Sequence, residues 1–311
     1  MDPSPLRAQF PPNASDMQAP GLPPRPGAVL FSGQSGCGAD RELHQIVSLR
    51  VATWNINSVR LRLDNVRRLI AEWAPDVLCL QETKSPDALF PSEAFETLGY
   101  RHRLVHGMKG YNGVAILSRV PIETPETRNW CAREDCRHAI AVLPGGIELH
   151  NFYIPAGGDI PDPETNPKFA HKLQFLDEVA AWFAAKRCDD RSMVAVGDLN
   201  IAPLEADVWS HKQLLTVVSH TPVEVERLGR LQQSGGFVDA VRHFVPPPER
   251  LYTWWSYRAR DWAASNRGRR LDHIWVTPRL VGNLAEAQVL RDSRSWPKAS
   301  DHVPVMLTIG S

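Results

Sequence analysis

The sequence lacks the features that would assign it to several large classes of protein. Its 35 basic and 35 acidic residues leave no formal net charge, so no global excess of charge indicates a polyanionic partner. No apolar run approaches the roughly 20 residues of a membrane-spanning helix. The apolar stretch at residues 28–31 is too short for the core of a signal peptide. We therefore expect a cytoplasmic protein with no membrane partner, associated with the nucleoid if the source is bacterial.

Cysteine is scarce, with five residues scattered along the chain. Cys131 and Cys136 form a closely spaced pair, which leaves a metal or disulfide interpretation open. No second pair completes a zinc site, so we expect reduced thiols that serve the structure.

Basic residues cluster locally despite the balanced total. One group comprises Arg60, Arg62, Arg67 and Arg68, and the other Arg258, Arg260, Arg267, Arg269 and Arg270. Each cluster is either a phosphate-binding patch or an ordinary solvated face.

The first 47 residues differ from the rest in composition. They contain eight prolines and no apolar period, and such a segment cannot bury enough surface to offset its ordering entropy. We expect residues 1–47 to form a disordered, proline-rich extension and residues 48–311 to form one domain. An over-called start of translation and a peptide-docking role for residues 23–26 remain alternatives.

From residue 49 onward the chain alternates between strand and helix patterns. Val66, Leu69, Ile70 and Trp73 have helical spacing and precede Pro75, and a second helix is expected over residues 169–183. Strands are expected at residues 49–54, 76–81, 113–117, 139–143, 147–153, 193–196, 251–255, 271–276, 287–290 and 303–309. This order predicts an α/β (α+β) domain with two mixed β-sheets packed together and helices outside.

Polar side chains recur where the predicted strands end or begin. They are Asn55, Asn57, Glu82, Tyr153, Asp198, Asn200, Asp272, Asp301 and His302. Each alone is most simply a turn or cap residue, since Asp and Asn are common there. Together they could supply hard oxygen ligands for a magnesium ion, a base and a phosphate-binding imidazole.

Six sequence blocks carry a family resemblance. They are Trp54-Asn55-Ile56-Asn57, Leu80-Gln81-Glu82-Thr83-Lys84, Tyr153-Ile154-Pro155, Gly197-Asp198-Leu199-Asn200-Ile201, Arg270-Leu271-Asp272 and Ser300-Asp301-His302. In this order they resemble the signature blocks of the exonuclease III family of abasic-site endonucleases, over about residues 49–309. The resemblance implies a DNase I-like four-layer sandwich with the active site at one edge.

The resemblance also implies a metal site. Glu82 would be the principal ligand of Mg²⁺, or of Mn²⁺, with Asn55, Asn57 and Asp301 nearby. A second metal ion, held by Asp198, Asn200 and His302, is an alternative within the family. Hard carboxylate and amide oxygens suit these ions better than zinc.

The remaining residues of the set have catalytic roles in the family. Asp198 would position or deprotonate the attacking water, with its carboxylate oriented by Asn200. His302 would bond a phosphate oxygen while Asp272 fixes the imidazole tautomer. Tyr153 would face the phosphate.

Substrate contacts are expected from eight further side chains. They are Arg60, Lys84, Tyr111, Asn112, Trp254, Trp255, Arg258 and Asn266. In the family, the loop with the two tryptophans lines a pocket for a base-less sugar, although a packed aromatic strand is the alternative. Arg269 stands where family members usually carry an apolar or aromatic residue, so the resemblance does not define the wall of this pocket there.

The function implied is hydrolytic incision of duplex DNA 5′ to abasic sites by a DNA-repair enzyme. Exonuclease action from 3′ to 5′ and removal of 3′-phosphates belong to the same family, so blocked 3′ ends are also expected substrates. We expect the protein to be a monomer. Two alternatives are a phosphatase or phospholipase of the wider superfamily acting on a non-DNA substrate and a catalytically silent DNA-binding relative. The first would release phosphate from inositol polyphosphates, and the second would have a broken set of site residues.

Deletion of residues 1–46 is expected to leave activity and melting temperature almost unchanged, because the segment has no apolar period and ends before the first strand. Thermal unfolding and DNA incision of the truncated and full chains provide the test. A fall of several degrees in melting temperature would contradict the prediction.

Overall fold

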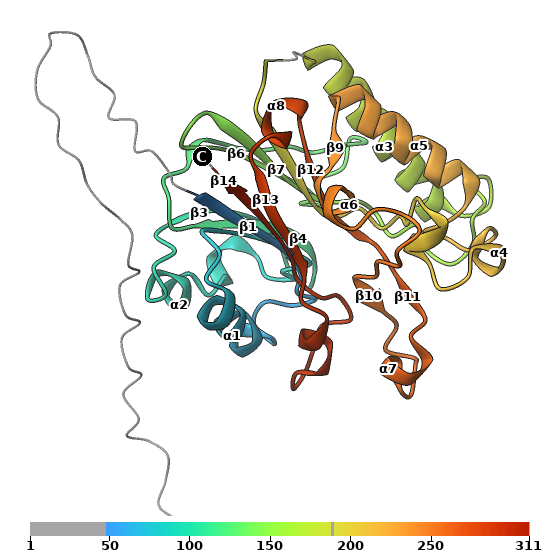
Figure 1. Ribbon diagram of the computed structural model, residues 1–311, viewed down its shortest axis with the longest axis horizontal. Helices are drawn as coiled ribbons and strands as arrows, with labels where there is room; N and C mark the ends of the chain where they lie inside the picture. Colours follow the sequence, from blue (N-terminus) through green and yellow to red (C-terminus); the bar gives the residue numbers. More distant parts are fainter. Residues whose placement is uncertain (1–47, 188–189, 311) are drawn as a thin grey trace, which may run out of the picture. The chain divides into compact units, whose positions relative to one another are not determined.

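The computed structural model describes residues 48–187 and 190–310, and the expected N-terminal extension lies outside them. Two six-stranded mixed sheets dominate the domain (Figure 1). The strand order is β13-β14-β1-β2-β4-β3 in the first sheet and β5-β6-β7-β8-β12-β9 in the second. A two-stranded ribbon, β10-β11, projects beside them with α7 at its tip.

The strands are short and alternate with helices along the chain. In the first sheet they are β1 (Ser48–Asn55), β2 (Val77–Gln81), β3 (His102–Met108), β4 (Tyr111–Ser118), β13 (Leu284–Val289) and β14 (Val305–Gly310). In the second they are β5 (Glu123–Thr127), β6 (His138–Leu143), β7 (Ile147–Tyr153), β8 (Met193–Asp198), β9 (Val238–Asp239) and β12 (Asp272–Val276). The ribbon is β10 (Trp254–Trp255) and β11 (Gly268–Arg269).

Two long helices and several short ones accompany the sheets. The α-helices are α1 (Leu63–Trp73), α2 (Ser92–Glu96), α3 (Pro167–Lys186), α4 (His211–Leu214), α5 (Pro222–Gly235), α6 (Ala240–Phe244), α7 (Trp262–Ser265) and α8 (Pro278–Val281). Three 3₁₀ turns are η1 (Asp87–Leu89), η2 (Glu205–Asp207) and η3 (Arg291–Ser295). Within the described ranges, no helix combines the length and apolar character needed to cross a membrane.

Three apolar clusters hold four layers together. The central one fills the space between the sheets, where Val51 and Ile116 of the first sheet share a cluster with Val194 and Ile274 of the second. A second cluster joins the outer face of the first sheet to α1 and α2, and a third joins the outer face of the second sheet to α3 and α5 (Figure 1). The expected four-layer sandwich is thereby confirmed.

The register of the second sheet places three functional side chains on neighbouring strands. Tyr153 of β7 lies opposite Asp198 of the parallel strand β8, and Asp198 lies opposite Asp272 of the antiparallel strand β12. In the first sheet, β1 is paired with β2 in parallel and with β14 antiparallel. The polar ends of the central strands therefore come together at one edge.

The sequence missed several elements at the margins. No strand was expected for β3 or β5, and no helix for α5. All five residues of β5 are exposed, so it lacks the alternation that marks a half-buried strand. The expected strand at residues 251–255 is wrong in extent, because only Trp254–Trp255 pair with β11.

Gly197 is required where β7 and β8 approach each other beside the site. A Cβ atom there would lie 1.9 Å from the carbonyl oxygen of Phe152, and φ is +139°. Gly145 also has a positive φ, +81°, but a Cβ there would meet nothing within 4 Å.

Gly197→Ala is therefore expected to lower the free energy of unfolding by about 3 kcal/mol more than Gly145→Ala, because the strands must separate to admit the methyl group. Denaturant unfolding of the two variants tests this. Equal losses would show that backbone conformation alone, and not strand spacing, requires glycine.

Candidate active site

The candidate active site lies where strands of both sheets end. β1 ends at Asn55, β7 at Tyr153 and β8 at Asp198, while Glu82 directly follows β2. β12 begins with Asp272 on the same side because it runs antiparallel to β8. The turn before β14 adds Asp301 and His302. The structure thus brings together all nine residues that the strand-end pattern singled out, through the contacts described below.

Several site residues have left-handed backbone conformations. Asn57, Glu82, Lys84 and Asn200 have φ values of 46°, 49°, 50° and 54°. Such conformations are uncommon for non-glycine residues and concentrate at functional sites, where the surrounding contacts must enforce them.

The Glu82 carboxylate is surrounded by donors. Its Oε1 accepts hydrogen bonds from Asn55 Nδ2 at 3.0 Å and from the Tyr153 hydroxyl at 2.8 Å. Its Oε2 lies 2.7 Å from Lys84 Nζ. Burial alone would raise the pKa of Glu82, but Lys84 and the hydrogen bonds outweigh it and hold the pKa below its usual value. Glu82 is therefore an anion at neutral pH.

Asp198 is a buried carboxylate held by two carboxamides. Its side chain is 1% exposed. Asn55 Nδ2 donates to Oδ2 at 2.9 Å, while Asn200 donates from its backbone N–H to Oδ1 at 2.9 Å and from Nδ2 to Oδ2 at 3.1 Å. Burial is the main cause that raises the pKa of Asp198, to about 7. A carboxylate with this pKa can take a proton from water near neutral pH.

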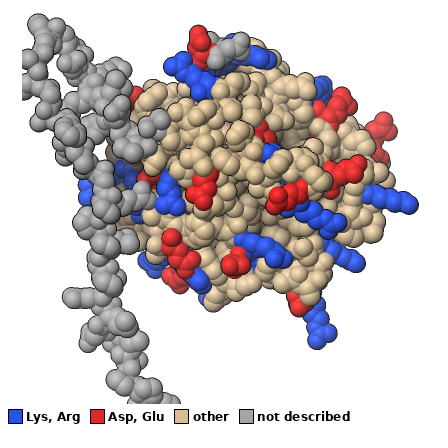
Figure 2. All heavy atoms as spheres, in the orientation of Figure 1, with Lys and Arg blue, Asp and Glu red and all other residues tan. Residues whose placement is uncertain are grey.

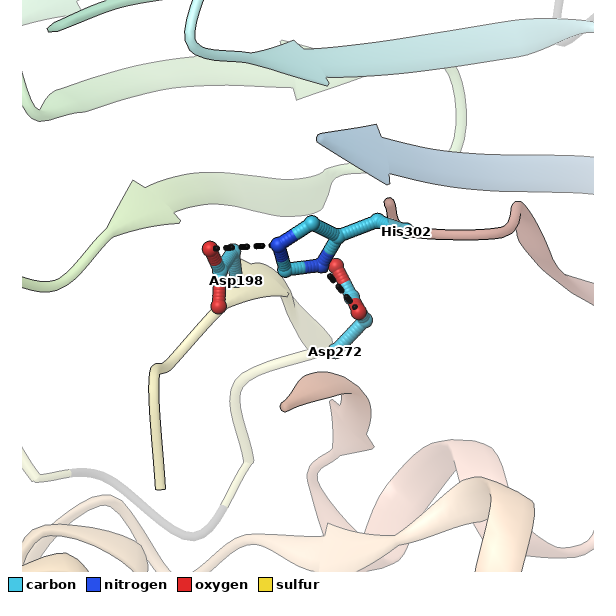
Figure 3. A group of neighbouring side chains, drawn as sticks. All are labelled: Asp198, Asp272 and His302. Carbon is cyan, nitrogen blue, oxygen red and sulfur yellow. Dashed lines mark hydrogen bonds and ion pairs between the residues drawn. The ribbon is translucent and has the colours of Figure 1, made fainter. Parts of the chain in front are cut away.

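His302 lies between Asp272 and Asp198, as Figure 3 shows. Its Nδ1 is 2.8 Å from Asp272 Oδ2, and its Nε2 is 3.6 Å from Asp198 Oδ2. Burial acts to lower the pKa of His302, yet the carboxylates of Asp272 and Asp198 outweigh it and raise the pKa to about 10. The imidazolium can therefore donate at both nitrogens, with Nδ1–H directed to Asp272.

Asp301 completes the acidic side of the site. It accepts hydrogen bonds from Asn57 Nδ2 at 3.2 Å and from Trp254 Nε1 at 3.0 Å. The Asn57 Oδ1 atom accepts from Lys84 Nζ at 2.6 Å. The Lys84 ammonium thus contacts Glu82 and Asn57, and Asn57 connects this pair to Asp301.

The donor set fits a divalent cation. The site contains four carboxylates, from Glu82, Asp198, Asp272 and Asp301, and two basic side chains, Lys84 and His302, lie against them. The oxygens of Glu82 and Asn57 already gather around a cation, the Lys84 ammonium. A surplus of carboxylates over basic groups, together with hard oxygen donors, suits magnesium or manganese.

The expected second metal site differs in composition from the acidic cluster in the structure. Ligand atoms of Asp198, Asp272 and His302 lie within 4.8 Å of one another. Asn200 instead donates its amide hydrogens to Asp198 and to the Ile154 carbonyl. Asn55, expected beside the metal, uses its NH₂ group to bridge Glu82 and Asp198, while its Oδ1 accepts from the Asn57 backbone.

The expected substrate contacts divide into exposed and buried side chains. Arg60, Tyr111, Arg258 and Asn266 are exposed, Lys84 and Trp254 are half-buried, and Asn112 and Trp255 are buried. Asn112 accepts from Arg137 and donates to the Asp135 carbonyl. The Trp255 side chain, 2% exposed, donates to Asn266. Both side chains are thus buried and hydrogen-bonded within the protein, and their contact with substrate stays a prediction.

The structure divides each arginine cluster of the sequence into exposed and buried side chains. Arg60, Arg258, Arg260 and Arg267 are exposed. Arg62 and Arg270 are buried, and Arg270 is ion-paired with Asp207 and Asp239. Arg67 and Arg68 pair with acidic residues on their own helix. On the face drawn in Figure 2, basic and acidic side chains are interspersed.

Sequence reasoning missed supporting residues around the site. Thr253 donates to Asp272 Oδ2 at 2.6 Å, and the Arg137 guanidinium lies 4.8 Å from the centre of the Tyr153 ring. Lys172, fully buried, donates to the Asn200 carbonyl at 2.8 Å and pairs with buried Glu224 at 2.5 Å. A lysine beside Leu173 on an otherwise apolar helix face was the available signal for this pair.

A family model, the Endonuclease/Exonuclease/phosphatase family, matches residues 52–302, which include every residue of the site. The chain belongs to this family. It is 30% identical to exodeoxyribonuclease III of Haemophilus influenzae over 83% of this chain and 98% of that protein. The family resemblance seen in the sequence is confirmed, within the exonuclease III and AP endonuclease branch.

Solved structures agree with this assignment. An AP endonuclease from Archaeoglobus fulgidus superposes with a TM-score of 0.77 and 33% identity, covering 84% of this chain and 99% of that one. The 3′ phosphatase NExo from Neisseria, bound to a product DNA hairpin, has a TM-score of 0.77 and 30% identity, covering 85% and 100%.

Asp272→Ala and His302→Ala are each expected to lower the rate of phosphodiester hydrolysis at least about 100-fold. The first removes the carboxylate that orients the imidazole, and the second removes the imidazole that would donate to the phosphate. The double variant should be within about threefold of the slower single variant, since residues that act as a unit have non-additive effects. Single-turnover rates at saturating magnesium measure this. Fully multiplicative losses would mean that Asp272 and His302 act separately.

Proposed function

We propose that this chain is a magnesium-dependent DNA-repair phosphodiesterase that cleaves duplex DNA hydrolytically on the 5′ side of abasic sites. The observation that carries the proposal is the buried Asp198 carboxylate, fixed by Asn55 and Asn200 beside the His302 imidazolium. Phosphodiester hydrolysis needs a positioned water and donors for charge that develops on oxygen. The site supplies groups of both kinds.

Asp198 would orient the attacking water and accept its proton. Both of its oxygens receive amide hydrogen bonds, so the carboxylate cannot rotate freely. Its raised pKa, about 7, suits proton acceptance near neutral pH. Lys172 stabilises this geometry by donating a hydrogen bond to the Asn200 carbonyl.

His302 and Tyr153 would face the phosphate. With Nδ1–H engaged by Asp272, the Nε2–H of His302 is available to a non-bridging phosphate oxygen. Burial and the neighbouring Glu82 and Asp198 carboxylates raise the pKa of Tyr153, so its hydroxyl remains protonated and can donate. Donors placed in advance cost little reorganisation as negative charge grows.

Glu82 and Asp301, with the Asn57 amide oxygen, would hold the magnesium ion. When bound, the ion supplies Lewis-acid stabilisation of the phosphate charge. Lys84, which contacts both Glu82 and Asn57, would then be displaced from its present position.

Duplex DNA with abasic sites is the proposed substrate. Two solved relatives support DNA as the partner, the AP endonuclease of Archaeoglobus fulgidus and the 3′ phosphatase NExo with its DNA hairpin. Half-buried Trp254, bonded to Asp301, offers an aromatic surface beside the site. A nucleotide without a base costs less to move out of the stack, which favours such sites.

The protein is expected to incise an abasic duplex to give a 3′-hydroxyl end, and a chelator should abolish the reaction. Denaturing gels with end-labelled strands provide the measurement. Glu82→Gln should shift the magnesium midpoint upward by about tenfold or more with little change in DNA affinity, because it removes one ligand charge and keeps the shape.

Arg67→Gln is a suitable control, because Arg67 is exposed on α1 and pairs with Asp64. It should leave the magnesium midpoint unchanged. Products that end in an unsaturated 3′ aldehyde would contradict hydrolysis, and an unchanged midpoint in Glu82→Gln would contradict its role as principal ligand.

A further inference from the structure

Arg269 is a cation built into the wall of the site. Its strand β11 pairs with β10 so that Arg269 lies opposite Trp254, and its guanidinium carbon is 5.3 Å from the centre of the Trp254 ring. The same indole donates to Asp301, and Trp254 also forms an isolated bridge with His302. One aromatic side chain therefore contacts both Arg269 and the acidic side of the site.

Within the part of the chain that the structure describes, the positive charge of Arg269 has no dedicated counterion. Its Nη1 donates to two neutral acceptors, the Val218 carbonyl at 3.0 Å and Ser219 Oγ at 2.8 Å. Among residues 48–187 and 190–310, no carboxylate lies within 4.0 Å of the guanidinium, and its Nε is buried without a hydrogen-bond partner. The nearest acidic influence, Glu224, is already paired with Lys172.

The partly buried Arg269 guanidinium destabilises the folded protein unless an anion binds to it. Burial of a guanidinium without an anionic partner carries a desolvation penalty, and burial lowers the pKa of Arg269. The side chain is nevertheless only partly buried, so a bound molecule can reach it. Arginine is well suited to phosphate because its planar fork can donate two hydrogen bonds to one group.

A cation at this position would interact differently with the two phosphate groups that the family cleaves, an internal phosphodiester and a terminal 3′-phosphate. In a phosphodiester 5′ to an abasic site, the bridging oxygen leads to a neutral base-less sugar. A terminal 3′-phosphate instead has an additional unbridged, charged oxygen at that position. A guanidinium placed near that oxygen would stabilise the charged terminal group and would gain no such interaction from the bridging oxygen of the diester.

We propose that Arg269 is a specificity-determining residue that binds the terminal phosphate of DNA 3′-phosphomonoesters and biases this enzyme toward their removal. This inference rests on the proposed function. In the reaction a water oxygen bonds to phosphorus as the P–O3′ bond breaks. The water proton goes to Asp198, O3′ leaves with the bonding electron pair and takes a proton from solvent water to become a 3′-hydroxyl, and inorganic phosphate is released.

The test compares two substrates on one duplex, a nick with a 3′-phosphate and an abasic-site analogue. Arg269→Gln is expected to lower kcat/KM for phosphate release about 10- to 100-fold, as for loss of a hydrogen bond to a charged group, and to change abasic incision less than about threefold. Arg269→Lys keeps the charge but loses the planar fork, so it should recover only part of the loss. Inorganic phosphate, as a competitive inhibitor of abasic incision, should bind Arg269→Gln about tenfold more weakly.

Arg267→Gln is the matched control. Arg267 is exposed, lies two residues before Arg269, and its guanidinium carbon is 4.7 Å from the centre of the Trp209 ring. The variant therefore removes the same charge from the same segment and leaves the contacts of Arg269 in place. Its effect on the two substrates should be equal.

Parallel losses on both substrates in Arg269→Gln, with unchanged phosphate inhibition, would overturn the proposal and leave Arg269 as a support for residues 218–219. An unchanged ratio of the two activities would overturn it as well. A wild-type protein that acts on neither substrate with magnesium would instead refute the proposed function itself.

Discussion

The site depends on the side chain of Asn55, which joins the two sheets at their polar edge. Asn55 ends β1 in the first sheet, and its NH₂ group donates to Glu82 of the same sheet and to Asp198 of the other. The side chain is fully buried, so its amide group lies in a low-dielectric environment, where hydrogen bonds are electrostatically stronger than in water. One carboxamide therefore fixes the distance between the proposed metal ligand and the proposed base.

Other constraints follow from holding the two sheets together at this edge. Gln81 donates to Asn151 at 2.7 Å across the same interface, which adds a second buried polar link. Gly197 lets β8 approach β7 closely, so that Tyr153 and Asp198 stay in register. Catalytic groups on rigid strands can then meet a phosphate without a large rearrangement.

Much of the fold could be predicted from the sequence because its central strands are apolar and end in polar residues. The strands that end at Asn55, Tyr153 and Asp198 carry both signals. The edge strand β5 carries neither, since all its residues are exposed, and it pairs only because β6 lies beside it. Tertiary pairing of this kind leaves no local pattern.

The candidate site was predicted in its residues but not in its contacts. Motif order identified Asp272 and His302, whereas their 2.8 Å contact depends on how residues 30 apart fold together. The sequence could not show that Trp255 and Asn112 turn inward, or that Arg62 and Arg270 are buried and absent from any basic patch. Lys172 and Glu224 were missed because a charge on a helix usually indicates a solvated face.

In the proposed reaction, a water molecule positioned by Asp198 attacks phosphorus. Incision of an abasic duplex in ¹⁸O-labelled water, under single-turnover conditions and followed by mass spectrometry of both fragments, tests it most directly. The account predicts one ¹⁸O atom in the 5′-phosphate of the abasic fragment and none in the new 3′-hydroxyl. A cleaved strand with no ¹⁸O in that phosphate would contradict it.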